Sequence, residues 1–146
     1  LALVLVRAGR GAEAEETARR ALELEPQHMD ASLTLAEILH NQKRYAEAID
    51  LLAPLAEAAS GPELDARLGM ALEAAGDHTK AQPLLRRALT VYSSELDLVL
   101  AAARCEEAVG DISSAMALYE RAAKMAPPGR NRDEALAGVD RLALKR

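Results

Sequence analysis

The sequence contains no tryptophan, no phenylalanine and only three tyrosines, and its β-branched apolar residues are limited to six valines and three isoleucines. Aromatic and β-branched side chains are the ones that cover a pleated sheet, so their scarcity excludes a β-sandwich or β-barrel. What the 146 residues do contain is 32 alanines and 24 leucines. Both favour helix over strand. We therefore predict an all-α protein whose core is built from thin layers of small residues.

Residues for redox, metal or membrane roles are also few. The single cysteine, Cys105, has no partner within the chain for a disulfide. The opening apolar run, residues 1–6, is far shorter than the ~20 residues that cross a bilayer. The three histidines do not share the spacing of metal ligands: His28, His40 and His78. We expect no metal, no cofactor and no membrane partner.

The charge is acidic, with 18 lysines and arginines against 23 aspartates and glutamates, a net charge of −5. This sign opposes binding to phosphate backbones, so we expect no nucleic-acid partner. The bias towards alanine, leucine and arginine is typical of a GC-rich bacterial genome. The chain begins with leucine, and we expect it to be part of a longer protein, which leaves its compartment open.

A period of about 34 residues runs through the chain. Four short segments align in register, and the alanine that each contains recurs at intervals of 34, 33 and 34 residues. A second small or apolar position follows each of these alanines seven residues later. Because self-similarity at a fixed period is the mark of a repeat protein, we predict four tandem copies. The recurring alanines are Ala14, Ala48, Ala81 and Ala115.

Within each copy, apolar residues follow helical spacing on both sides of a short polar turn, which predicts two helices joined as a hairpin. Gly76 and Gly110 supply the positive φ that ends a first helix, and each is followed by an aspartate that caps the second. The second copy has Lys43 in place of this glycine. In the fourth copy Glu106 occupies a position that is leucine in the others, such as Leu39 and Leu72.

These residues resemble the tetratricopeptide repeat family, whose pattern of small and large apolar residues, glycine and proline spans about 34 residues. The third copy carries the pattern in Leu68, Gly69, Leu72, Gly76, Ala81, Leu85 and Ala88, and the fourth in Gly110, Ala115, Tyr119, Ala122 and Pro127. The resemblance implies a single domain, 1–146, folded as a right-handed α-solenoid with repeats at about 1–28, 29–61, 62–95 and 96–129. A helix at 131–146 would cap the array, or would open a fifth repeat.

Chemical motifs are few, and each has a structural explanation. The glycines of Gly9-x-Gly11 follow an apolar run, as in a dinucleotide site, but repeat register accounts for them. No nucleophile or orienting carboxylate keeps a constant spacing from His40, as a catalytic base would require. Cys105 falls at a repeat position that suits a small buried apolar residue. We predict no catalytic residues, so the chain is not an enzyme in its own right.

The resemblance implies a concave groove lined by the first helix of each repeat, which would bind a peptide, a helix or a protein surface. Acids outnumber arginines there, which favours an amphipathic ligand that is neutral to basic. Self-association, or a role as the regulatory or assembly arm of a larger enzyme, is the alternative, while an RNA-binding repeat conflicts with the spacing and the charge. The step of about 100° per residue selects the face of each of these helices that lies opposite the core. The candidate groove residues on or beside this face are Asp30, Leu33, Glu37, Asn41, Glu63, Arg67, Met70, Asp97, Leu100 and Arg104. We expect apolar contacts from Leu33, Met70 and Leu100, and orientation of the ligand by Glu37, Arg67 and Arg104.

Overall fold

The computed structural model describes residues 10–145, and within them it contains eight helices and no strand. The opening apolar run, the first helix expected of repeat one and Gly9 therefore fall outside the described residues. The all-α fold predicted from the composition is confirmed. The helices are α2 (Gly11–Leu24), α3 (Met29–Asn41), α4 (Tyr45–Ala58), α5 (Pro62–Ala74), α6 (His78–Leu89), α7 (Leu96–Val109), α8 (Ile112–Met125) and α9 (Arg130–Ala143).

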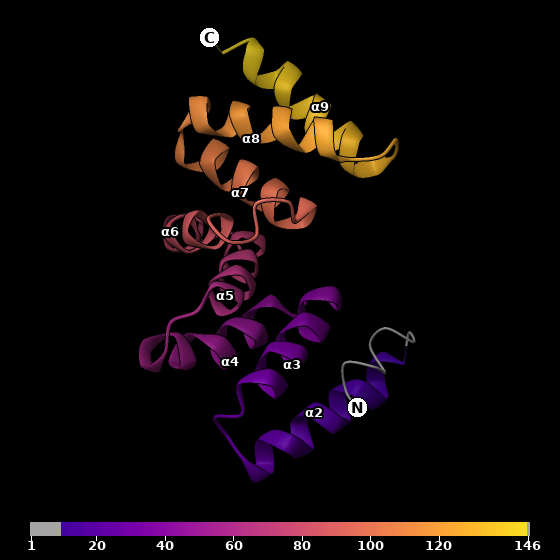
Figure 1. The fold of residues 1–146 in the computed structure, drawn as a ribbon, viewed down its shortest axis with the longest axis vertical. Helices are drawn as coiled ribbons and strands as arrows, with labels where there is room; N and C mark the ends of the chain where they lie inside the picture. The colour runs from indigo at the N-terminus through magenta and orange to yellow at the C-terminus, as the bar shows by residue number, and fades with distance from the viewer. Residues whose placement is uncertain (1–9, 146) are drawn as a thin grey trace.

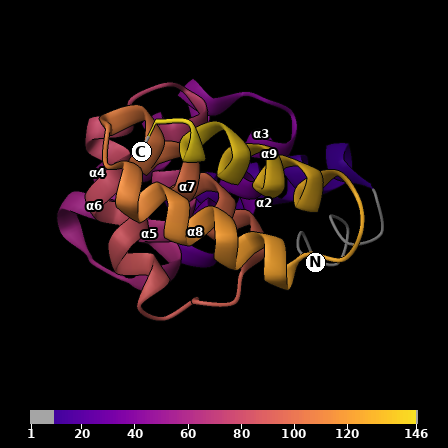
Figure 2. The ribbon, with the colours of Figure 1, turned by 90° about the horizontal axis from the view of Figure 1, so that it is seen from above.

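The helices stack one after another along the long axis of an elongated molecule (Figure 1). Each helix packs against the next in the chain, and α3, α5 and α7 also pack against one another in order. Viewed from above, α4 and α6 lie on one side of the stack and α3 and α9 on the other (Figure 2). This is the α-solenoid expected from the period.

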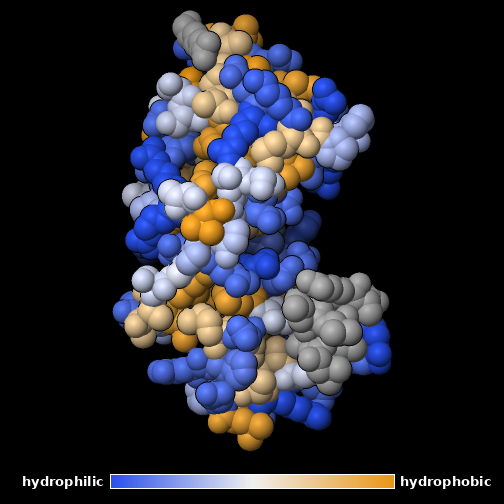
Figure 3. Space-filling model, in the orientation of Figure 1, coloured by the Kyte–Doolittle hydropathy of each residue, from blue (hydrophilic) through white to orange (hydrophobic). Residues whose placement is uncertain are grey.

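The core follows the stack as a series of layers. One cluster of buried residues extends from Ala18 on α2 to Cys105 on α7, and a second extends from Val99 on α7 to Leu142 on α9. The alanines that define the period, from Ala14 to Ala115, are all fully buried, which allows the helices to approach closely. On the face shown in Figure 3, hydrophobic residues form separate patches among hydrophilic ones.

The turns within the hairpins have the predicted geometry. Gly76 and Gly110 adopt φ angles of 92° and 89°. Asp77 and Asp111 accept hydrogen bonds from backbone N–H groups at the start of α6 and α8. Lys43 stands at the equivalent position of the α3–α4 turn and has a φ of 61°, so a residue with a Cβ is held in the left-handed region there.

We expect Lys43→Gly to stabilise the protein by about 0.5–1 kcal/mol, because the gain from removing the Cβ exceeds the extra entropy that glycine loses on folding. Urea-induced unfolding followed by circular dichroism measures this change. The reverse substitution, Gly110→Lys, serves as the control and is expected to destabilise. A loss of stability in Lys43→Gly would contradict this account of the turn.

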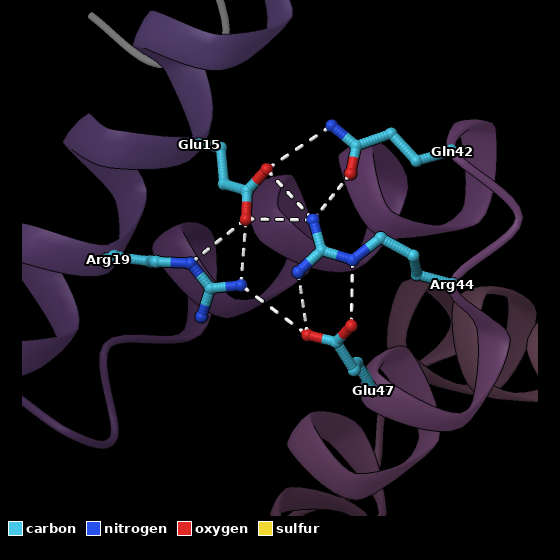
Figure 4. Close-up of polar contacts among 5 residues, drawn as sticks. All are labelled: Glu15, Arg19, Gln42, Arg44 and Glu47. Carbon is cyan, nitrogen blue, oxygen red and sulfur yellow. Dashed lines mark hydrogen bonds and ion pairs between the residues drawn. The ribbon is translucent and has the colours of Figure 1, made fainter.

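Polar side chains join α2 to the second hairpin (Figure 4). Glu15 on α2 accepts hydrogen bonds from Arg19 on the same helix, and from Gln42 and Arg44 in the α3–α4 turn. Arg44 also pairs with Glu47, with Nε 2.7 Å from Oε1. The hydrogen bond from Arg19, aided by those from Gln42 and Arg44, lowers the pKa of Glu15. The stability that this lowered pKa provides is therefore present above the unfolded-state pKa and is lost as the pH falls through the folded-state value.

Glu106, the charged residue at a leucine position, is buried at 3% exposure. Its carboxylate accepts hydrogen bonds from Nε and Nη2 of Arg86, at 2.6 and 2.8 Å, and from Nε2 of Gln82 at 2.7 Å. All three donors come from α6, which packs against α7. The carboxylate is therefore tolerated because the neighbouring helix satisfies it.

Candidate functional site

Two adjoining hollows are lined by α3, α5 and α7. We call the first, of about 310 Å³, the α9 hollow, because α9 also lines it. We call the second, of about 380 Å³, the Tyr92 hollow, because the α6–α7 loop also lines it. The α9 hollow is lined by Ala36, Glu37, His40, Asn41, Arg67, Met70, Asp97, Leu100, Arg104, Asn131 and Glu134. The Tyr92 hollow is lined by Glu37, Glu63, Ala66, Arg67, Met70, Tyr92, Glu95, Asp97 and Leu98.

Most of the candidate groove residues are brought together here. Eight of the ten line one or both hollows, and those common to both are Glu37, Arg67, Met70 and Asp97. Asn41, Leu100 and Arg104 line the α9 hollow alone, and Glu63 lines the Tyr92 hollow alone. The helix face chosen from the sequence therefore coincides largely with these two hollows.

Two candidates lie elsewhere. Asp30 is exposed and lines neither hollow. Leu33 was expected to offer an apolar contact, but it is 7% exposed and belongs to the core, as an inner helix of the stack is covered on more than one side. Leu100, only 2% exposed, also lies in the core, so it contributes a floor to the α9 hollow rather than a projecting contact.

The two arginines expected to orient a ligand are instead paired with carboxylates of neighbouring helices. Arg67 on α5 lies 3.1 Å from Glu37 on α3. Arg104 on α7 donates to the buried Glu73 on α5, at 3.0 and 3.1 Å, and to Glu134 on α9 at 2.6 Å. Although burial opposes it, hydrogen bonding to these two carboxylates raises the pKa of Arg104.

These pairs share a spacing that the sequence could have shown. The two partners of each pair are 30 or 31 residues apart in the sequence: 30 for Glu37 and Arg67, 31 for Glu73 and Arg104, and 30 for Arg104 and Glu134. That is about one helical turn less than the repeat, so each pair joins equivalent helices of adjacent repeats. The residues that sequence reasoning missed, Glu73 and Glu134, would have been found by searching for opposite charges at this interval.

His40 lies in the α9 hollow, with its ring edge-on to Tyr45 at a centroid distance of 5.1 Å. Burial, followed by the positive charge of Arg67, lowers its pKa. The lowered pKa favours the neutral imidazole over the positively charged form.

Little in residues 10–145 supports a metal site, a membrane-spanning helix or a reactive thiol. No group of three or more potential ligands is placed to hold a metal ion there. None of the helices described has the length and apolar character needed to cross a bilayer. Cys105 is buried, as its slot suggested, and burial raises the pKa of its thiol to about 11, which keeps it in the unreactive protonated form.

Solved structures with the same fold include YrrB, described as a TPR protein with an unusual peptide-binding site, with a TM-score of 0.72 and 20% identity over 97% of this chain and 80% of that one. MamA from Desulfovibrio magneticus has a TM-score of 0.72 and 11% identity, over 98% and 89% of the two chains. Another MamA crystal structure has a TM-score of 0.71 and 18% identity, over 99% and 94%. No curated protein is similar enough in sequence to count as a relative.

Two family models match the chain, one over residues 1–62 and the other over residues 72–137, and both describe a tetratricopeptide repeat. Together the two matches include residues from α2 to α9. The solved structures of similar fold agree with this family assignment. The chain belongs to the tetratricopeptide repeat family, whose repeats form a non-catalytic scaffold for protein interactions.

Proposed function

We propose that the groove formed by the α9 hollow and the Tyr92 hollow binds a peptide or helix of a partner protein that is neutral to basic and amphipathic. The observation that carries this proposal is the convergence of side chains from α3, α5 and α7 on two hollows with a common wall. A ligand crossing that wall would contact α3, α5 and α7 at once, which are equivalent helices of three successive repeats.

The lining suits an amphipathic ligand. Met70 offers partly exposed apolar surface to both hollows, and Tyr92 offers it to the Tyr92 hollow. Beneath them lies a floor of buried apolar side chains, those of Ala36, Leu98 and Leu100. Buried apolar and aromatic surface of this kind supplies most of the affinity of peptide grooves.

The charges favour basic ligands. Arg67 is already paired with Glu37, as is Arg104 with its two carboxylates. In contrast, the Tyr92 hollow contains three carboxylates for which the described residues offer no ion pair: Glu63, Glu95 and Asp97. These groups leave the groove with an excess of negative charge, which would attract and orient cationic side chains.

The test begins with an array of amphipathic peptides that differ only in net charge, followed by fluorescence anisotropy on those that bind. We expect basic and neutral peptides to bind. Met70→Ala and Asp97→Asn should each weaken binding about tenfold, equivalent to roughly 1.4 kcal/mol. An array on which only acidic peptides bind, or unchanged affinity in both variants, would refute the proposal.

Matched controls lie outside the hollows. Asp30 occupies the first turn of α3 just as Asp97 occupies that of α7, and Met125 on α8 is partly buried like Met70. Asp30→Asn and Met125→Ala should change affinity less than twofold. Light scattering after size-exclusion chromatography should show a monomer, whereas a concentration-independent dimer would favour self-association.

A further inference from the structure

The last helix does more than cover the end of the stack. Asn131 and Glu134 on α9 line the α9 hollow together with residues of α3, α5 and α7. The sequence predicted that this helix caps the array or opens a fifth repeat, and it gave no sign that the helix contributes to the groove. Because α9 presents a carboxylate to the hollow, it contributes to the charge that an incoming ligand meets.

The carboxylate of Glu134 accepts a hydrogen bond from Arg104. Each of the three nitrogen atoms of its guanidinium donates to a carboxylate: Nε and Nη2 to Glu73, and Nη1 to Glu134. Glu73 is 9% exposed and binds in the bidentate manner that orients an arginine firmly. Glu134 is 36% exposed and receives one hydrogen bond at the edge of the hollow.

The two carboxylates therefore have different roles. Glu73 alone neutralises Arg104 and holds it in place, so a second negative charge is not needed to satisfy the guanidinium. Glu134 occupies the nitrogen, Nη1, that Glu73 leaves open. A ligand carboxylate that approaches Nη1 would compete with Glu134 for this nitrogen and would be repelled by its negative charge.

The charge balance of the α9 hollow depends on the same residue. Three carboxylates line the hollow, those of Glu37, Asp97 and Glu134, against the guanidiniums of Arg67 and Arg104. Loss of Glu134 would make these lining charges equal in number and leave Nη1 of Arg104 open.

We infer that Glu134 is a specificity-determining residue, which excludes acidic side chains from the α9 hollow by occupying Arg104. This inference rests on the proposed function of the groove. It identifies α9 as part of the ligand surface, and it predicts that one substitution there changes the charge preference of the groove without touching its apolar floor.

The experiment compares the wild type, Glu134→Ala and a matched control, Asp133→Ala. Asp133 is the adjacent residue of α9, carries the same charge, is exposed and lines neither hollow. The probe is Nα-acetyl-aspartate methylamide, followed through the NMR signal of the Arg104 Nε–H group. We expect Glu134→Ala to bind this probe about tenfold more tightly than either the wild type or Asp133→Ala.

Absence of any shift at Arg104 in Glu134→Ala, or equal binding in Asp133→Ala, would overturn the inference. Circular dichroism is used to check that each variant is folded. Glu134→Gln retains the hydrogen-bond acceptor but not the charge, so its affinity for the probe should fall between those of the wild type and Glu134→Ala. Because the probe is a single residue, these results do not depend on the peptide array. Failure of the array would count against peptide binding, whereas failure of the titration would count against the role of Glu134.

Discussion

Replacing Arg86 with alanine is expected to destabilise the protein by about 2–3 kcal/mol, although its side chain is half exposed to solvent. The reason is its partner: Glu106 is 3% exposed, and Arg86 supplies two of its three hydrogen bonds. Removing one member of a buried pair leaves an uncompensated charge, which costs about 3–5 kcal/mol when both groups are fully buried and less when one is near solvent. Chemical denaturation of the variant measures the loss.

Glu106→Leu removes the buried charge itself instead of its partner Arg86. Leucine fills the equivalent position in other repeats, where Leu39 and Leu72 are buried, and an apolar residue of suitable volume in place of a buried ion is often neutral or stabilising. The double variant Arg86→Ala with Glu106→Leu should therefore regain most of the stability lost in Arg86→Ala. If Arg86→Ala alone unfolded at the same denaturant concentration as the wild type, the pair would have no structural importance.

The second large effect is expected at Tyr119, where alanine should reduce the free energy of unfolding by about 3–5 kcal/mol. The ring is 1% exposed on α8, and its hydroxyl donates to Oε2 of Glu107 on α7 at 2.9 Å. On its other side α9 approaches through Gly138, where a Cβ would lie 2.7 Å from ring atoms. Loss of the ring would leave a cavity among three helices, and thermal unfolding would reveal the cost.

The contact between Tyr119 and Gly138 can be isolated with a double-mutant cycle. Gly138→Ala alone should destabilise, because its methyl group would collide with a buried ring. In the Tyr119→Ala background the same substitution should stabilise by about 1 kcal/mol, because the space is free and alanine favours helix. The same sign in both backgrounds would show that the ring does not limit the approach of α9. Tyr119→Phe removes only the hydroxyl group and is expected to lower the free energy of unfolding by about 1 kcal/mol.

Much of the fold could be predicted because its causes are local and repeated. Alanines at intervals of 33 and 34 residues indicated where helices approach, and these positions are fully buried. Gly76 and Gly110 indicated turns, and both have positive φ. Lys43 was recognised as a departure, but only the backbone shows that it adopts the same left-handed conformation.

The candidate site could be predicted only in outline. Helical periodicity selected the face bearing Arg67, Met70 and Asp97, which line both hollows. It misplaced Leu33, because a helix wheel drawn for one buried side does not represent a helix covered on several sides. It also missed Tyr92, which lies in the loop between α6 and α7, where no period applies.

By itself, the sequence determined that the described helices pair into hairpins and where their turns lie, since helix propensity, capping and φ preference act within a few residues of one another. The tertiary structure decided which charges meet: Arg104 with Glu134, and Arg86 with Glu106. An ion pair between helices depends on how far one helix is displaced along its neighbour, and that displacement results from side-chain packing across the whole layer. For the same reason, only the stacked helices show that α9 belongs to the groove.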